Sequence, residues 1–131
     1  MISELYKQLE ALATSEFGDI VEDAEMIPSY TGRVRKLRIK LIDQTFVDVW
    51  YTADGEYSFH WEQSMIRNSI YRHDNAPHEK WSYISTFPRH CHDGVQDNVV
   101  ESHLSPVPAT ALREFLSIVR KKIIQLKHIS S

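Results

Sequence analysis

The sequence contains almost no cysteine and no long apolar run. Its single cysteine, Cys91, excludes an intramolecular disulfide framework and is typical of a protein of the reducing cytoplasm. No apolar run approaches the roughly 20 residues that a membrane helix needs. The opening residues M-I-S-E-L-Y-K-Q-L-E lack the cationic and apolar regions of a secretory signal. We therefore expect a cytoplasmic protein with no membrane partner.

An excess of positive charge is also lacking. The chain carries 15 lysines and arginines against 18 aspartates and glutamates, a formal net charge of −3. This balance argues against tight, non-specific DNA binding, although a local basic face can still hold a phosphate backbone. The length of 131 residues and the hydrophobic fraction of 42% are typical of one globular unit. We expect residues 1–131 to form a single domain.

Two segments have the apolar spacing of amphipathic helices. Near the N-terminus this spacing predicts a short helix over residues 2–13. A longer helix is predicted to begin just after Pro108, with an apolar stripe that runs to Leu126. The acidic segment 14–28 is predicted to be a loop, with at most a short strand at 19–22.

Apolar and polar residues alternate in the middle of the chain, which predicts β-strands. The predicted strands cover residues 33–42, 46–52, 56–63 and 66–73, with Trp81–Phe87 as a candidate fifth strand and 96–103 as an ambiguous segment. Short connections, one of them containing Asp54-Gly55, favour antiparallel hairpins. The predicted fold class is therefore α+β: a curved antiparallel sheet of four or five strands, packed on one face by the N- and C-terminal helices.

The other face of this sheet is expected to be polar. Its predicted members are Lys36, Arg38, Lys40, His60 and Glu62. Such a stripe is most often a solvated or edge-protecting face. Together with neighbouring aromatic residues, it also suits a non-catalytic module that binds nucleic acid or a partner protein.

The histidines are concentrated in two short segments. Four of the seven lie within Y-R-H-D-N-A-P-H at 71–78 and F-P-R-H-C-H at 87–92. Histidine has an unperturbed pKa near neutral pH, so it serves acid–base chemistry and metal ligation alike. Arg72 and Arg89 add fixed positive charge, which suits an anionic substrate. These two segments are the part of the sequence that points to chemistry.

The two segments resemble the motifs of the TumE-like toxins of prokaryotic toxin–antitoxin pairs. The resemblance rests on R-x-D-N-A-P-H within 71–78 and on F-P-x-H-x-H at 87–92, and Y-S-F-H-W at 57–61 and the closing helix also fit. It implies a toxin that is encoded beside a helix-turn-helix antitoxin, its neutralising partner. Family members often have a second histidine after the one that matches His78, where this chain has Glu79.

The first chemical hypothesis is cleavage of RNA without a metal. Attack of a ribose 2′-hydroxyl on the adjacent phosphate needs a base, an acid and positive charge. His73 or His78 is expected to pair with His90 or His92 as base and acid, while Asp74 holds a histidine tautomer. The expected substrate-binding residues are Arg72 and Arg89 for phosphate oxygens, Asn75 as a hydrogen-bond donor, and Tyr71 and Trp81 for stacking on bases.

The second hypothesis is a metal-dependent hydrolase or nuclease. His90 and His92 are two residues apart, so in an extended segment both side chains point the same way and Cys91 points the opposite way. With His78 or Asp74 they would make a three-ligand site for zinc or manganese. The first hypothesis, in contrast, needs no cofactor.

Two structural alternatives stay open. Asp74 and Asn75 precede Ala76-Pro77, where their side chains would cap backbone groups in an ordinary turn. The apolar stripe of the last helix is expected to be core or the contact of a homodimer.

Overall fold

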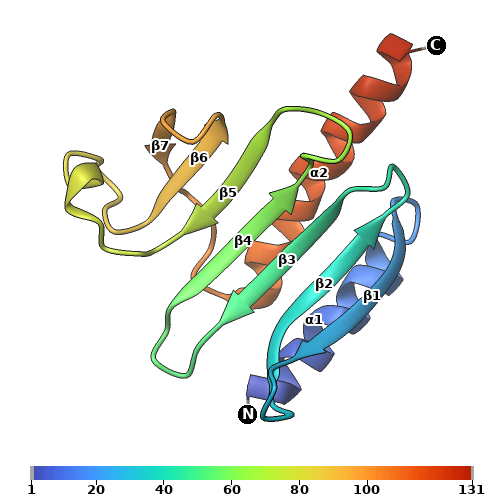
Figure 1. The fold of residues 1–131 in the computed structure, drawn as a ribbon, viewed down its shortest axis with the longest axis horizontal. Coiled ribbons are helices and arrows are strands. Elements are labelled where there is room, and N and C mark those ends of the chain that lie inside the picture. Colours follow the sequence, from blue (N-terminus) through green and yellow to red (C-terminus); the bar gives the residue numbers. More distant parts are fainter. Residues whose placement is uncertain (1, 131) are drawn as a thin grey trace.

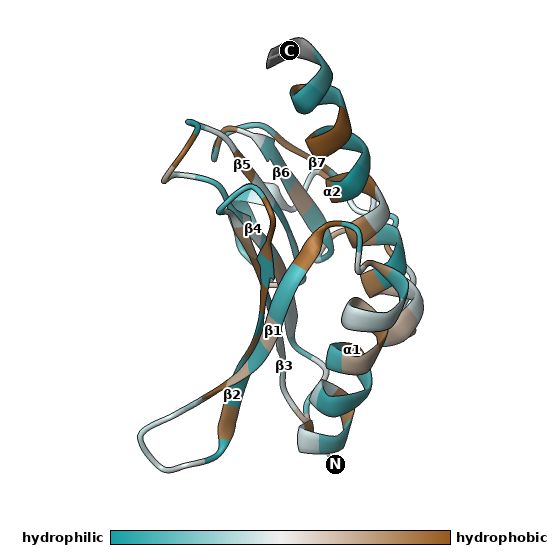
Figure 2. Ribbon diagram, turned by 90° about the vertical axis from the view of Figure 1, so that its right-hand side faces the viewer, coloured by the Kyte–Doolittle hydropathy of each residue, from teal (hydrophilic) through white to brown (hydrophobic). Residues whose placement is uncertain are grey.

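The computed structural model describes the backbone of residues 2–130 and the side chains of residues 2–128. The protein has two layers, a β-sheet and a pair of helices. The elements in chain order are α1 (Ile2–Glu16), β1 (Val21–Pro28), β2 (Val34–Leu41), β3 (Phe46–Tyr51), β4 (Tyr57–Glu62), β5 (Ile70–Asp74), the 3-10 helix η1 (Glu79–Trp81), β6 (His90–Gly94), β7 (Val99–Glu101) and α2 (Pro108–Ser130). The strands form one antiparallel meander in sequence order (Figure 1). Both helices cover the same face of the sheet (Figure 2). We call this the helix face and the opposite one the outer face.

The α+β class with packing helices is confirmed, but the sheet has seven strands among the described residues rather than four or five. Segment 21–28, predicted as loop, is β1 and pairs with β2 from Val21↔Leu41 to Pro28↔Val34. β1 is an edge strand and is only half-buried, so acidic side chains are tolerated there. These acidic residues interrupt the alternation of apolar and polar residues by which a strand is recognised in the sequence.

The segment from 74 to 101 accounts for the other differences. The strand predicted at Trp81–Phe87 is wrong, because η1 and a series of turns occupy this region. β6 and β7 follow instead. The first three residues of β6, from His90 to His92, are all buried and two of them are polar, so no apolar alternation marks this strand.

The helix face carries the core. One cross-strand row on this face runs through Leu37, Val49, Phe59, His73 and Cys91. Phe115 of α2 packs against this layer, with its ring centroid 5.5 Å from that of Phe59 and 5.2 Å from that of Tyr71. Each large apolar side chain buried here contributes about 1.5–3 kcal/mol to stability.

The outer face carries a polar row that crosses β1 to β6. Its members are Glu25, Arg38, Asp48, His60, Arg72 and His92, each opposite the next. The expectation that Arg38 and His60 share a face is therefore confirmed. Asp48 accepts two hydrogen bonds from Arg38, at 2.9 and 3.0 Å, and lies 3.0 Å from the ammonium of Lys36. The shared carboxylate reduces the positive charge that Arg38 and Lys36 offer to a phosphate backbone.

No helix within residues 2–130 is both long and apolar enough to cross a membrane.

Asp48 makes a testable contribution to stability. Burial raises the pKa of its carboxyl, but the hydrogen bonds from Arg38 and Lys36 outweigh burial and lower it below the usual value. The ion pair therefore stabilises the fold above about pH 4 and loses this effect as the pH falls below the usual pKa. We expect Asp48→Asn to reduce the free energy of unfolding by about 1–3 kcal/mol at pH 6 in urea denaturation.

The loss should shrink as the pH falls below about 4, because the unfolded chain then takes up a proton at this carboxyl and the ion pair of the folded state contributes less to stability. Asp54→Asn, at an exposed hairpin position, is the matched control and should be near neutral throughout. A loss from Asp48→Asn that stays constant across this range would contradict the assignment.

Candidate functional site

The pairing of β5 with β6 brings the two histidine segments together. Asp74 stands opposite His90, and Arg72 stands opposite His92. Because side chains alternate along a strand, all four point to the outer face. Cys91 points to the helix face, as its position between the two histidines predicts.

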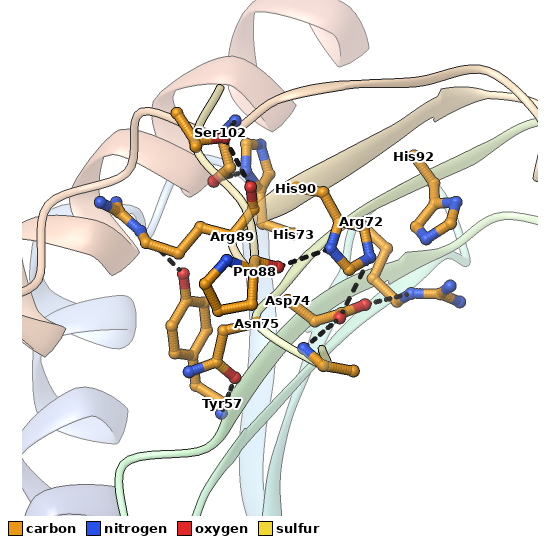
Figure 3. Close-up of polar contacts among 12 residues, drawn as sticks. Tyr57, Arg72, His73, Asp74, Asn75, Pro88, Arg89, His90, His92 and Ser102 are labelled. Carbon is orange, nitrogen blue, oxygen red and sulfur yellow. Dashed lines mark hydrogen bonds and ion pairs between the residues drawn. The ribbon is translucent and has the colours of Figure 1, made fainter. Parts of the chain in front are cut away.

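The Asp74 carboxylate is the centre of this group (Figure 3). Its Oδ2 accepts a hydrogen bond from Nε of Arg72 at 3.0 Å. Its Oδ1 accepts one from the backbone N–H of Ala76, also at 3.0 Å, and lies 3.2 Å from Nε2 of His90. These contacts fix the orientation of the carboxylate and partly neutralise it.

Backbone carbonyls orient both imidazole rings. Nδ1 of His90 donates to the carbonyl oxygen of Pro88, and Nδ1 of His92 donates to that of Gln96, both at 2.8 Å. A carbonyl oxygen only accepts, so each Nδ1 carries the proton. In both rings Nε2 is therefore the nitrogen that is left for another partner.

The three side chains form a compact potential ligand set. One ligand atom each from Asp74, His90 and His92 lies within 4.8 Å of the others, and all three residues are buried. The 3.2 Å separation of the carboxylate oxygen and Nε2 of His90 is close to the spacing of two ligands bound about 2.0 Å from one metal. The sequence offered Asp74 and His78 as alternatives for the third ligand, and Asp74 is in the set. The set does not include His78.

The environment of His92 favours its neutral form. Burial lowers the pKa of His92, the hydrogen bond to Gln96 raises it, and the charge of Arg72 lowers it, with a net decrease. A neutral ring with Nδ1 protonated presents a lone pair on Nε2. This lone pair can bind a metal or accept a proton.

The connection from β5 to β6 covers the two histidines. The ring centroid of Trp81 lies 5.8 Å from that of His92 and 6.5 Å from that of His90. The exposed fraction is 3% for His90 and 1% for His92. Trp81 was expected to stack on a substrate base, and in this structure its ring lies against the imidazoles instead.

His73 does not join the group, because it points to the helix face. Its Nδ1 hydrogen-bonds with the Ser102 hydroxyl at 2.7 Å and its Nε2 with the Tyr71 hydroxyl at 2.9 Å. Burial lowers the pKa of His73 to about 4. The pairing of His73 with His90 or His92 as base and acid is therefore wrong, since the sheet separates them.

Tyr71 and Cys91 are also part of the core. The Tyr71 ring is buried and stacks on Phe115, so it is not available to an RNA base. Burial raises the pKa of the Cys91 thiol to about 12. Cys91 is an inert core residue rather than a nucleophile.

Three other predicted residues have separate positions. His78 is exposed and caps η1, with its Nδ1 accepting from the backbone N–H of Lys80 at 3.2 Å. Asn75 braces the β3–β4 hairpin, because it accepts from the N–H of Tyr57 and donates to the carbonyl of Gly55. Arg89 points away from His90 and donates to the Tyr57 hydroxyl at 3.3 Å (Figure 3). Both arginines were expected to hold phosphate oxygens of the substrate, and the structure places Arg89 on the face opposite Arg72.

Sequence reasoning missed the groups that orient the centre. The carbonyls of Pro88 and Gln96 and the N–H of Ala76 are backbone groups, which any residue supplies. The Gln96 side chain also meets Arg72, with Oε1 accepting from Nη2 at 3.4 Å. No residue type signals such roles in a sequence without the register of the strands.

Comparison with known proteins gives one match. The family model of the toxin TumE covers residues 8–123 of this chain. No curated protein and no solved structure matches. The matched range contains both histidine segments and every described strand, which confirms the resemblance seen in the motifs. The chain therefore belongs to the TumE toxin family.

Proposed function

We propose that this protein is the toxin of a toxin–antitoxin pair and that it cleaves RNA at the Asp74–His90–His92 centre. Family membership supports the toxin role, and such a toxin needs an antitoxin to neutralise it. We expect the antitoxin to be a helix-turn-helix protein encoded next to it. In this proposal the toxin acts in the cytoplasm, where its RNA substrate is found.

The convergence of Asp74, His90 and His92 on one point is the observation that carries the proposal. Histidine ligands of metals almost always donate their second N–H to a carbonyl or carboxylate, and both rings here already do so. Three protein ligands with an open fourth position are the arrangement of catalytic zinc sites. We therefore favour a centre that holds zinc or manganese. A metal there would polarise a phosphoryl oxygen and activate a water molecule.

Arg72 and Trp81 supply the further features that suit RNA. The guanidinium of Arg72 lies beside the centre and adds a fixed positive charge where phosphate charge develops. The Trp81 ring lies against the two imidazoles, and once displaced from them it would be an aromatic surface for an unstacked base. Because His90 and His92 are almost fully covered, the substrate must displace Trp81 to reach them.

A metal-free mechanism is the second candidate, and a specific contact supports it. His90 faces a hydrogen-bond acceptor at both nitrogens, the carbonyl of Pro88 and the carboxylate of Asp74. This arrangement suits an imidazolium, which can act as a general acid. His92, whose Nε2 is unprotonated, would then be the general base.

Metal content separates the two mechanisms. We expect about one zinc or manganese per chain by elemental analysis, because three potential ligands converge on one point. Asp74→Asn and His92→Gln should lose the metal, while His103→Gln, at an exposed histidine away from the centre, should retain it. If the wild-type protein takes up neither metal on titration, the metal-dependent mechanism fails and the acid–base mechanism remains.

RNA cleavage tests the activity itself. With single-stranded RNA, His92→Gln and Asp74→Asn should reduce the cleavage rate by about 100-fold or more, because each removes a group that contacts the reacting phosphate or its metal. His78→Gln should cleave at the wild-type rate, since His78 lies outside the centre. EDTA should abolish cleavage if a metal is required. Equal cleavage by wild type and His92→Gln would refute the assignment of the site.

Expression in a bacterial host tests the toxin role. Wild type should arrest growth, Asp74→Asn should not, and co-expression of the adjacent helix-turn-helix protein should restore growth. Comparable soluble levels of both toxin variants, checked by immunoblot, are the control. Growth arrest that is equally strong with Asp74→Asn would place the toxic activity elsewhere on the chain.

A further inference from the structure

A cavity lies on the helix face, at the end of the sheet where β6 begins. Its volume is about 380 Å³, within the range of pockets that hold small ligands. The lining residues are Leu5, Tyr51, Thr52, Ala53, Gly55, Tyr57, Arg89, Ser105, Pro106 and Pro108. None of them belongs to the Asp74–His90–His92 centre. Arg89 and His90 are neighbours in sequence, but their side chains leave the strand on opposite faces (Figure 3).

Arg89 is electrostatically unlike the other half-buried arginines. Those others form ion pairs with carboxylates: Arg38 with Asp48, Arg67 with Asp43, Arg72 with Asp74 and Arg120 with Asp19. Within residues 2–130, Arg89 meets no carboxylate in an ion pair, and its Nε donates to the Tyr57 hydroxyl. The positive charge of the Arg89 guanidinium is therefore not neutralised by a carboxylate of the described residues, and it can pair with an anionic ligand.

The surroundings reinforce the positive potential at Arg89. Among the described residues that line the cavity, Arg89 alone carries a charge. The long helix α2 begins at Pro108, which also lines the cavity, so the positive end of the helix dipole lies at its wall. An anionic group inside this cavity would therefore meet a guanidinium and a helix N-terminus and no carboxylate of the lining.

The remaining lining residues are mostly apolar or aromatic, with two hydroxyl side chains from Thr52 and Ser105. The rings of Tyr51 and Tyr57 have centroids 5.8 Å apart and are tilted by 33°. Pro106, Leu5 and the hairpin residue Ala53 add further apolar lining. Aromatic rings beside a guanidinium are the combination that proteins use to hold a nucleobase and its phosphate.

We infer that this cavity binds a nucleotide unit, with its phosphate on Arg89 and its base against Tyr51 and Tyr57. The choice of a nucleotide, rather than another ring-bearing anion, rests on the proposed action on RNA. The unit can come from the RNA strand or from a free nucleoside monophosphate. The cavity is a binding subsite on the face opposite the centre, so it holds the ligand without taking part in the cleavage.

Titration calorimetry in EDTA, with the full-length protein, tests this inference. AMP and UMP should each bind saturably, whereas inorganic phosphate and adenosine, which supply only one half of the ligand, should bind more weakly. Arg89→Gln should weaken AMP binding at least about tenfold, since it removes a charge-assisted contact. Arg89→Lys should retain part of the affinity because it keeps the charge. Arg33→Gln, at an exposed arginine of the β1–β2 turn, is the matched control and should bind like wild type.

Three results would overturn the inference: no saturable binding of AMP or UMP, equal affinity for phosphate and AMP, or unchanged AMP binding by both Arg89→Gln and Arg89→Lys. A 5′-phosphorylated oligonucleotide in the same titration distinguishes the RNA strand from the free nucleotide as the source. Asp74→Asn should leave AMP binding intact. Nucleotide binding without RNA cleavage would refute the proposed function alone, and RNA cleavage without nucleotide binding would refute this inference alone.

Discussion

The antiparallel pairing of β5 with β6 is the constraint on which the rest of the site depends. It sets Asp74 opposite His90 and Arg72 opposite His92, so that residues from two separate motifs share the outer face. The same pairing turns His73 and Cys91 into the core. A shift of one residue in β5 would turn His73 to the outer face, and a shift in β6 would turn His90 and His92 to the helix face. The packing of His73 against Tyr71, Ser102 and Phe115 therefore helps to fix the register of the centre on the other side.

The centre is buried, polar and almost fully partnered. Asp74 receives hydrogen bonds from Arg72 and from the backbone, and each imidazole uses Nδ1 on a carbonyl oxygen. Unpartnered polar atoms in such a place would be strongly destabilising, so the shared network both stabilises the site and limits its rotamers. What remains for a ligand is a small, defined set: the Nε2 atoms of His90 and His92 and one carboxylate oxygen. Preorganisation of this kind is what a metal centre or an acid–base pair requires.

Charge pairing divides the surface into distinct regions. On the outer face, Asp48 and Glu25 lie among the cations of β2 and pair with them, so this face does not offer a continuous positive stripe. On the helix face, Arg89 meets no carboxylate among the described residues and faces a cavity with aromatic walls. A net charge of −3 is thus compatible with a local anion site, because the arrangement of the charges decides where an anion can bind.

Local pattern by itself determined both helices, four of the strands, the shared direction of His90 and His92, and the family. These features depend on the period of apolar residues within one segment or on short motifs, and both can be read without any tertiary contact. The strands that were missed are β1, an acidic edge, and β6, where buried histidines break the apolar pattern, while the short strand β7 lies in the segment that was ambiguous. Only the tertiary structure decided that Asp74 rather than His78 completes the centre, that His73 belongs to the core, and that Arg89 faces a separate cavity. Periodicity reports which residues of a strand share a face, but the strand register and the packing helices determine which face that is and what lies opposite it.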